Sequence, residues 1–523
     1  MSRATREVVV VGGGTAGWIA ANAIATECRH WAAPLRVTLV ESPDIPTIGV
    51  GEGTWPSMRG TLQRMGVDED EMLRTCDASF KQGTWFRGWS GRSGEDAYIH
   101  PFSLPVEYAR LNPATYWLRE GNEEPFAAFA TPQVAAIEQG LAPKDASAPQ
   151  YAFAFNYAYH LDAGKFAGLL ERHATGEVGV THILANVASI ETRENGDIAA
   201  LRLDTGSRLA GDLFVDCTGQ RALLIGQHYG QPFASVRDTL FNDRAVVVQV
   251  PHESADSTIA SATLATAGPN GWIWDIGLQS RRGLGHVFAS SRMDEDAAQE
   301  ALKQYVANTS PSIDPTSLQY RTIAFEPGYR ETPWHRNCVA IGLSAGFVEP
   351  LEASALALIE QSANIVAQQM PGDRQVMDVV AKRFNDRLRY HWQRIIEFLK
   401  LHYATSVRDQ PYWQAHRDRS TWPPGLADRL LLWQQQTPWH DDAPRLDELF
   451  PSASYQYVLY GMGFRPRQVG GASPSYLALR SQADQVFHAT RTQAAQVAKL
   501  LPSNRELLGA IAARAQTGRA NGD

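Results

Sequence analysis

The stretch from Glu7 to Ala25, which reads EVVVVGGGTAGWIAANAIA, constrains the fold more than any other part of the chain. It begins with apolar β-branched residues, passes through a glycine-rich turn and continues with apolar residues that favour a helix. The turn carries the pattern G-x-G-x-x-G, whose glycines permit a tight turn, the approach of a pyrophosphate and close packing of helix on strand. The stretch therefore predicts a strand-turn-helix unit that holds a dinucleotide at the helix N-terminus. The residues expected to contact this cofactor are Gly12, Gly14, Thr15, Ala16 and Gly17.

A carboxylate follows the next predicted strand. Residues Leu35 to Val40 form an apolar run that ends at Glu41. At this distance from the glycines, a carboxylate accepts a hydrogen bond from a ribose hydroxyl. Glu41 is therefore expected to bind the unphosphorylated adenosine ribose of FAD or NAD, and the motif does not distinguish the two. The alternative is a chance glycine loop, which the order strand, turn, helix, strand and Glu disfavours.

The composition argues against several classes of protein. The chain has 523 residues, of which 44% are hydrophobic, so it can bury a large core. Its 48 basic and 56 acidic residues give a net charge of -8, without a Lys/Arg cluster that would follow a phosphate backbone. Nucleic acid is therefore not an expected partner. No apolar stretch is long enough to span a bilayer, and the apolar N-terminal run is broken by glycines and lacks a signal-peptide cleavage pattern, so we expect no membrane association.

The cysteines predict neither a metal site nor a disulfide framework. The chain has four cysteines, which are far apart in the sequence and form no C-x-x-C pair. This usage fits a reducing cytoplasm. We therefore expect a cytoplasmic protein without a bound metal.

Two later segments look like further strand ends at the cofactor. Asp212 to Gly219, DLFVDCTG, is an apolar strand that ends in Thr-Gly, and Asn337 to Ile341 is a strand followed by a glycine-containing loop. Three strand ends that meet one cofactor are more typical of a large FAD-binding fold than of a compact NAD domain. Gly342 and Gly346 of the last loop are therefore expected to bind the cofactor as well. The Gly/Pro-rich segment from Ser42 to Arg59 is expected to be a loop that covers it.

The C-terminal part of the chain is predicted to be mainly helical. A helix is expected to begin near Ser354, and Arg374 to Tyr403 forms a long helical pattern. An earlier helical pattern starts at His160. The apolar stripe expected along the long helix consists of Val376, Val380, Phe384, Leu388, Trp392, Ile395 and Leu399.

The predicted fold class is α/β with a large helical part: a Rossmann-like FAD-binding fold of the flavin monooxygenase type, joined to a mainly helical substrate-binding region. We expect a discontinuous FAD-binding module over residues 1–370, with a substrate-site insertion at about 55–150. Residues 371–523 are expected to form a helical region that covers the substrate.

The combination of these segments resembles the flavin-dependent tryptophan halogenase family over nearly the full chain. The matching motifs are VVVVGGGTAGWIAA, ESPDIPTIGVGEGTWPS, ASFKQGTWFRGW, DLFVDCTGQRALLI, GWIWDIG, GFVEPLEASALALIE, EFLKLHY and YVLYGMGF. In such enzymes, reduced FAD and oxygen convert chloride or bromide to hypohalous acid, which travels through the protein to an electron-rich arene. The resemblance thus implies FAD used as FADH2, a halide co-substrate and a small aromatic substrate, such as an indole derivative.

The resemblance implies two catalytic residues. Lys81, in ASFKQGTWF, matches the family's catalytic lysine, which polarises hypohalous acid through a hydrogen bond or is itself halogenated on nitrogen. Without the resemblance, a solvated surface lysine would be the better interpretation. Glu352, in EPLEAS, matches the catalytic glutamate, which positions the electrophile together with the lysine and removes the proton of the halogenated ring. The alternatives are a structural acid at the helix start, or Glu349 in its place.

Further roles follow from the same resemblance. The backbone N–H groups of Ser354 and Ala355 are expected to bind halide, although this chain has P-L-E-A-S-A where the family has P-L-E-S-T-G. Trp272 and Trp274 match the W-x-W-x-I-P signature that separates flavin from substrate, with Gly277 in place of the proline. Core packing is their alternative role.

His100 and Phe102 lie where the family stacks its aromatic substrate. The alternative for His100, which stands next to a proline, is a structural hydrogen-bonding role. No segment resembles a nicotinamide site, so a separate NAD(P)H-dependent flavin reductase is expected to supply the reduced flavin. The oligomeric state stays open, with a homodimer as one candidate. Two other functions compete with halogenation: an aromatic hydroxylase on the same scaffold, and a flavin-binding protein without catalysis.

Overall fold

The computed structural model describes residues 4–31, 35–45, 51–94, 96–119, 123–467 and 474–520. The chain forms two compact units, each built from three separate stretches. The first unit comprises Met1–Ala78, Leu161–Arg237 and Phe325–Trp392, and the second comprises Ser79–His160, Asp238–Ala324 and Gln393–Asp523. The FAD-module and helical-region limits expected from the sequence, 1–370 and 371–523, stay a prediction.

The glycine-rich stretch forms the predicted strand-turn-helix unit at the centre of the first unit. Strand β1 (Glu7–Val11) leads into helix α1 (Thr15–Glu27). β1 pairs in parallel with β2 (Arg36–Glu41) on one side and with β12 (Leu213–Asp216) on the other. The sheet order is β20-β21-β12-β1-β2-β8. The remaining strands of this sheet are β8 (Thr181–Leu184), β20 (Trp334–His335) and β21 (Cys338–Ala340).

Both later strand ends join this sheet, as predicted. β12 lies beside β1, and β21 pairs in parallel with β12, so the carboxyl ends of β1, β12 and β21 lie at the same edge. Because parallel strands are buried on both faces, their sequences are continuous apolar runs and not alternating ones. This explains why the strands were recognisable from the sequence.

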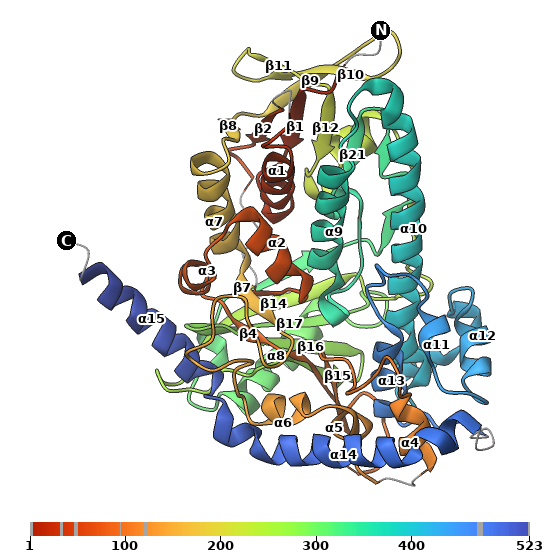
Figure 1. Ribbon diagram of the computed structural model, residues 1–523. Helices are drawn as coiled ribbons and strands as arrows, with labels where there is room; N and C mark the ends of the chain where they lie inside the picture. Colours follow the sequence, from red (N-terminus) through yellow and green to blue (C-terminus); the bar gives the residue numbers. More distant parts are fainter. Residues whose placement is uncertain are drawn as a thin grey trace. The chain divides into compact units, whose positions relative to one another are not determined.

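Helices cover the sheet of the first unit. Figure 1 shows α1 flanked by α7 (Ala163–Gly176) and α9 (Ser354–Gln368), and α1 packs against both. The helical pattern expected from His160 begins later, because Ala158–Asp162 forms strand β7 and Asp162 caps α7 by accepting from the Lys165 N–H. The other elements of this unit are β3 (Gly51–Gly53), α2 (Ser57–Met65), α3 (Glu69–Thr75), β9 (Val187–Thr192), β10 (Ile198–Leu203), β11 (Arg208–Ala210), β13 (Phe233–Ser235), β19 (Gly328–Arg330) and β22 (Gly346–Phe347).

The expected covering loop, Ser42–Arg59, is only partly irregular. It contains β3 and the start of α2, and its residues 46–50 lie outside the described residues.

Helix α10 (Arg374–Thr405) contributes Arg374–Trp392 to the first unit. On this helix Val376 is 46% exposed, so its place in the predicted apolar stripe was wrong. The buried face starts instead at Met377, about 100° around the helix, and continues to Val380 and Phe384.

The second unit is built on a seven-stranded sheet of order β18-β14-β17-β16-β15-β5-β6. Its pairs are antiparallel except for β15 with β5. Helix α8 (Glu295–Thr309) packs on β14 and β17 through an apolar cluster that includes Leu302 and Val306. The strands are β5 (Gly83–Arg87), β6 (Ala97–Pro101), β14 (Arg244–Pro251), β15 (Thr263–Gly268), β16 (Gly271–Gly277), β17 (Arg281–Phe288) and β18 (Tyr320–Ala324), and β4 (Ser79–Lys81) pairs with β7.

The second unit also contains several helices. The long helix α14 (Pro474–Leu500) lies along α5 and α6 (Figure 1), with aromatic side chains such as Phe129 and Phe487 between them. The other helices of this unit are α4 (Pro113–Arg119), α5 (Phe126–Ala130), α6 (Gln133–Glu138), α11 (Pro411–Arg417), α12 (Leu426–Leu432), α13 (Ser452–Gly461) and α15 (Asn504–Ala520).

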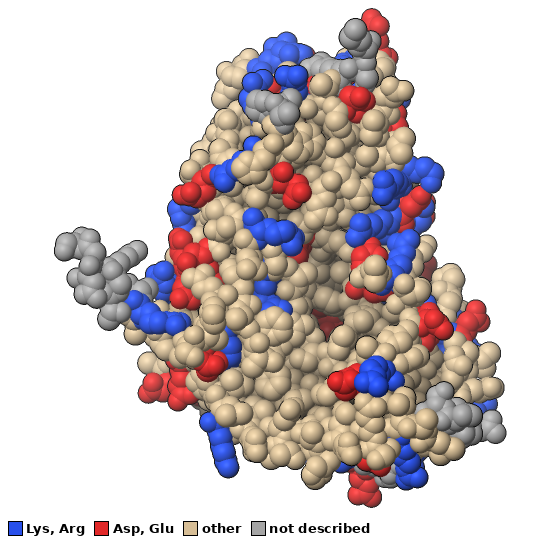
Figure 2. All heavy atoms as spheres, in the orientation of Figure 1, with Lys and Arg blue, Asp and Glu red and all other residues tan. Residues whose placement is uncertain are grey.

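Figure 2 shows acidic and basic side chains interspersed over the face in view. Within the described ranges, no helix combines the length and apolar character needed to cross a membrane. The four cysteines are buried and free.

Candidate active site

The glycine turn has the geometry of a diphosphate cradle. Gly12 adopts φ +111°, and a Cβ there would lie 2.3 Å from the carbonyl oxygen of Cys217. A Cβ at Gly17 would lie 1.9 Å from the Gly12 carbonyl oxygen. A Cβ at Gly14 would meet nothing within 4 Å among the described residues beyond its chain neighbours. The space at Gly14, in front of the first N–H groups of α1, therefore fits a phosphate.

Glu41 ends strand β2 beside this turn. A Cβ at Gly13 would lie 2.0 Å from the Glu41 carboxyl carbon. Oε2 of Glu41 lies 3.1 Å from Nε2 of His182, whose Nδ1 lies 3.3 Å from Oε1 of Glu171. The imidazole also meets the Trp18 ring edge to face at 4.9 Å. His182 therefore anchors the Glu41 carboxylate. Because strand β8 brings His182 beside β2, no sequence motif could have indicated it.

The ends of β12 and β21 lie next to the glycine turn. Asp216, at the end of β12, is fully buried and accepts hydrogen bonds from the N–H groups of Leu224 and Ile225, both at 2.8 Å. After β21, a Cβ at Gly342 would lie 2.8 Å from the Cβ of Ala16. The loop that follows continues to Gly346 in β22. Gly342 therefore packs against the start of α1, next to the predicted cofactor contacts.

The start of α9 carries the remaining candidates of the first unit. Glu352 and Ala353 both adopt left-handed backbone conformations, with φ +62° and +53°, before the helix begins at Ser354. The N–H groups of Ser354 and Ala355 belong to the first helical turn, where backbone donors are available to an anion. Glu352 is 5% exposed and Glu349 is 1% exposed, so burial does not separate the two candidate glutamates.

A network behind this turn was not apparent in the sequence. The indole N–H of Trp55 donates to the carbonyl oxygen of Glu352 at 2.7 Å. Glu360, farther along α9, accepts from the hydroxyls of Ser57 at 2.8 Å and Thr61 at 2.6 Å on α2. Burial raises the pKa of Glu360 to about 7, although these hydrogen bonds oppose the rise. Only the pairing of α2 with α9 brings these residues together.

Lys81 lies in the second unit, in strand β4. Its side chain is 1% exposed, which excludes a solvated surface lysine. Its ammonium nitrogen lies 5.3 Å from the centroid of the Phe102 ring, within cation–π range. The register of β4 with β7 places Lys81 opposite Ala158 and Ser79 opposite His160. Burial and the Lys81 charge lower the pKa of His160 well below its usual value, so this imidazole is neutral.

The predicted stacking residues lie on β6 and just after it. His100 is 4% exposed, and its Nε2 lies 3.0 Å from the hydroxyl of Ser454. Its ring is near those of Phe398 and Tyr457, at 5.9 and 6.0 Å. Phe102 donates its N–H to the carbonyl of Gln82, the residue after Lys81, at 2.9 Å. This hydrogen bond fixes the Phe102 backbone beside the lysine strand.

The two tryptophans of β16 are packed in the sheet of the second unit. Trp272 and Trp274 are 1% and 8% exposed, with ring centroids 6.3 Å apart. Trp274 lies over Gly285 of β17, where a Cβ would be 2.1 Å from the indole. A Cβ at Gly277 would be 3.2 Å from the Cγ2 of Ile259. Position 277 is therefore closely packed even without the proline of the family signature.

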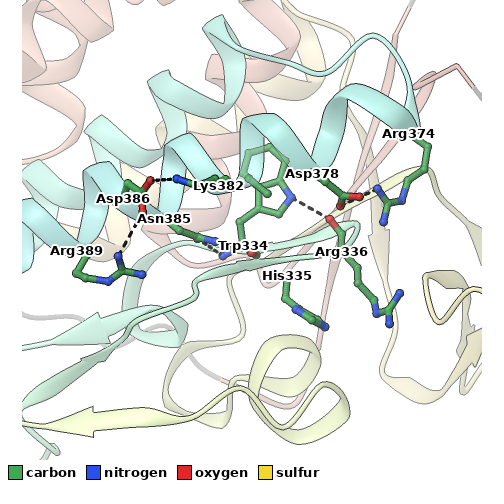
Figure 3. Close-up of a pocket in the computed structure, with 10 residues that line it drawn as sticks. Trp334, His335, Arg336, Arg374, Asp378, Lys382, Asn385, Asp386 and Arg389 are labelled. Atoms are coloured by element: carbon green, nitrogen blue, oxygen red, sulfur yellow. Dashed lines mark hydrogen bonds and ion pairs between the residues drawn. The ribbon is translucent and has the colours of Figure 1, made fainter.

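A separate pocket of about 350 Å3 lies between α10 and the β20-β21 hairpin of the first unit (Figure 3). Several of its charged side chains pair with one another, as in Arg374–Asp378 at 2.8 Å and Lys382–Asp386 at 2.7 Å. The predicted site residues are not among those that line it, which are Trp334, His335, Arg336, Arg374, Asp378, Ala381, Lys382, Asn385, Asp386 and Arg389.

Comparison with known proteins decides the family. The family model described as tryptophan halogenase matches residues 7–474. The chain belongs to the tryptophan halogenase family. It is 31% identical to tryptophan 7-halogenase RebH of Lentzea aerocolonigenes, with 97% of this chain and 99% of RebH covered. The predicted family is therefore confirmed.

Solved structures of tryptophan halogenase relatives have the same fold. A tryptophan halogenase from Shewanella frigidimarina NCIMB 400 superposes with a TM-score of 0.93 at 46% identity, with 98% of each chain covered. Xcc4156, a flavin-dependent halogenase from Xanthomonas campestris, gives a TM-score of 0.83 at 33% identity, with 97% of this chain and 98% of the other covered. The predicted fold class and the enzyme class, a flavin-dependent halogenase, are confirmed, and membership of the family implies the use of flavin and halide.

The candidate residues of this tryptophan halogenase family member divide between the two units. The first unit holds the glycine turn, Glu41, Gly342, Gly346, Glu352, Ser354 and Ala355. The second unit holds Lys81, His100, Phe102, Trp272 and Trp274. Their individual roles are taken up below as proposals.

Proposed function

We propose that this enzyme uses FADH2, oxygen and a halide ion to halogenate the indole ring of a tryptophan-like substrate. The observation that supports this most directly is the buried Lys81, which lies in the family's ASFKQGTWF motif with its ammonium over the Phe102 ring. A desolvated ammonium is a strong hydrogen-bond donor, and it can polarise hypohalous acid. The Phe102 ring beside this ammonium suits contact with a flat aromatic substrate.

The first unit would bind the cofactor. The open space at Gly14, the left-handed turn at Gly12 and the carboxylate of Glu41 fit the diphosphate and ribose of FAD. Gly342 and Gly346 would approach it from the neighbouring strand ends. When bound, reduced FAD supplies, with oxygen, the two-electron oxidation that turns halide into hypohalous acid.

The chain's own groups would then direct the halogen. The N–H groups of Ser354 and Ala355 hold the halide, and the ammonium of Lys81 donates a hydrogen bond to hypohalous acid. As the ring carbon bonds to the halogen, the Glu352 carboxylate removes the proton from that carbon. His100 and Phe102 stack on the substrate ring, and the indoles of Trp272 and Trp274 keep the substrate away from the flavin.

Further parts of the proposal concern partners and domains. A separate NAD(P)H-dependent flavin reductase would deliver the reduced flavin. Residues at about 55–150 would form the substrate-site insertion of the FAD-binding module, and residues 371–523 would cover the substrate. Chloride and bromide are both candidate halides. A homodimer is one candidate assembly.

Mass spectrometry of the product tests this function. The purified protein is supplied with a flavin reductase, NADH, FAD, oxygen, chloride or bromide, and a panel of tryptophan and other indoles. We expect products with the isotope pattern of one added halogen. A product that gains one oxygen instead would identify an aromatic hydroxylase, the alternative that the change to Gly277 leaves open.

A further inference from the structure

The turn that carries Glu352 has an unfavourable backbone. Glu352 and Ala353 are consecutive non-glycine residues with left-handed φ values of +62° and +53°. L-residues rarely adopt this region, so a surrounding structure must hold the turn. The carbonyl of Glu352 belongs to the peptide that joins the two residues. Whatever fixes this carbonyl therefore fixes the ψ angle of Glu352 and the φ angle of Ala353 together.

Trp55 makes this contact. Its indole N–H donates to the carbonyl oxygen of Glu352 at 2.7 Å. Trp55 itself is held at the start of α2, because its own carbonyl accepts from the N–H of Met58 at 3.0 Å. Trp55 stands two residues before α2, and its indole links the segment that leads into this helix to the left-handed turn.

Helix α2 is in turn fixed to α9 farther along that helix. The buried carboxyl of Glu360 on α9 accepts from Ser57 and Thr61 of α2, and the amide of Asn364 donates to the Thr61 hydroxyl at 2.9 Å. α9 begins directly after the turn, so the turn is contacted by Trp55, just before α2, and the helix that follows the turn is contacted by α2 itself. We propose that Trp55 is a positioning residue that aims the Glu352 carboxylate at the substrate ring. Glu360 supports this role because it ties α2 to α9. This inference rests on the proposed role of Glu352.

The test removes the indole N–H without changing the shape of the side chain. Benzothienylalanine, which replaces the N–H by sulfur, is placed at position 55 by amber suppression, and Trp55→Phe is made in parallel. A displacement of a reacting group by about 1 Å can cost about 100-fold in rate, so we expect kcat for halogenation to fall by roughly 10- to 100-fold. FAD affinity and KM for tryptophan should stay within about twofold, and the thermal unfolding midpoint should fall by no more than a few degrees, as expected for the loss of one hydrogen bond.

A matched control is available in the same unit. The indole N–H of Trp334 donates to the carbonyl of Arg336 at 3.2 Å, and Trp334 lines the pocket that holds none of the predicted site residues. Trp334→Phe should keep kcat. A second readout is the kinetic isotope effect with ring-deuterated tryptophan, which should rise in the Trp55 variants, because a misaimed carboxylate slows proton removal.

The Glu352→Gln variant separates the proposed role of Trp55 from the proposed role of Glu352. If Trp55 acts through Glu352, adding Trp55→Phe to Glu352→Gln should lower kcat for halogenation only slightly further. Wild-type kcat in both Trp55 variants, or an equal loss in both backgrounds, would overturn the role of Trp55 and leave the proposed function intact. Full activity of Glu352→Gln alone would instead overturn the proposed role of Glu352.

Discussion

Nε2 of His182 lies 3.1 Å from the carboxylate of Glu41, the residue proposed to bind the adenosine ribose. A second carboxylate, Glu171, holds the other ring nitrogen at 3.3 Å, so the imidazole cannot turn away. A hydrogen bond of this kind contributes about 1 kcal/mol, which is several-fold in affinity. We therefore expect His182→Leu to weaken FAD binding by roughly threefold to tenfold, as measured by fluorescence titration. An unchanged affinity would mean that Glu41 does not need this support.

Two glycines of the cradle should respond differently to alanine. At Gly12 a Cβ would clash with the Cys217 carbonyl at φ +111°, so Gly12→Ala should destabilise the protein without FAD by more than about 2 kcal/mol. At Gly14 a Cβ has open space, so Gly14→Ala should leave the FAD-free protein as stable as wild type. If the diphosphate occupies that space, Gly14→Ala should still weaken FAD binding. Unfolding midpoints with and without FAD measure both effects, and normal FAD binding by Gly14→Ala would place the diphosphate elsewhere.

Removal of the Lys81 ammonium should stop halogen transfer. General acid groups typically contribute about 100- to 10,000-fold to a reaction rate. We therefore expect Lys81→Ala to form halogenated product at least about 100-fold more slowly than wild type. FAD binding should be unchanged. Lys144→Met is the matched control, because Lys144 is also buried and also lies near aromatic rings, 5.4 Å from that of Tyr157. Halogenation by Lys81→Ala at the wild-type rate would remove Lys81 from the mechanism.

The sequence predicts those parts of the local structure that a short continuous pattern encodes. The glycine turn, Glu41 and the parallel strands are encoded in short continuous segments, so their fold could be predicted. The supports of the site depend on long-range packing. His182 meets Glu41 across a strand pair, and Trp55 meets Glu352 from a distant part of the sequence. Such contacts leave no periodic pattern in either segment. The sequence alone therefore does not indicate that His182 and Trp55 support the site.

The same limit explains the errors in local structure. The pattern of α7 extends backwards from Ala163 and so predicts a helix at His160, yet the strand pairing with Ser79 decides its conformation. Val376 fits the expected stripe in spacing but lies one position away from the face that other elements cover. In both cases tertiary contacts decided between two acceptable local patterns.

The two buried glutamates near the helix start can be separated by paired substitutions. Glu352→Gln removes the proposed base while keeping size and polarity, so we expect a fall of at least about 100-fold in product. Glu349→Gln should retain most of the activity, because the family match favours Glu352. Product formation and FAD affinity are measured for both variants under the same conditions. The reverse ranking would assign the proton removal to Glu349.

Glu360 should make stability depend on pH. Burial raises its pKa from 4.5 to about 7, so between these values the folded protein binds more protons than the unfolded chain. The contribution of Glu360 to stability should therefore be greatest below about pH 4.5 and should fall as the pH rises through 7. A shift of this size corresponds to about 3 kcal/mol, lost over that interval.

Glu52 should also make stability depend on pH, because burial and the charge of Asp162 raise its pKa to about 7 as well. The contributions of Glu52 and Glu360 therefore have to be distinguished. Urea unfolding of wild type, Glu360→Gln and Glu52→Gln at pH 5.5 and 8 distinguishes the two. Each variant should lose less stability than wild type on going to pH 8, because a neutral amide does not ionise. The hydroxyls of Ser57 and Thr61 can still donate to the amide oxygen that replaces the carboxylate, so Glu360→Gln should keep the link between α2 and α9. If the difference between pH 5.5 and 8 is the same in Glu360→Gln as in wild type, Glu360 is already ionised in the folded protein at pH 5.5.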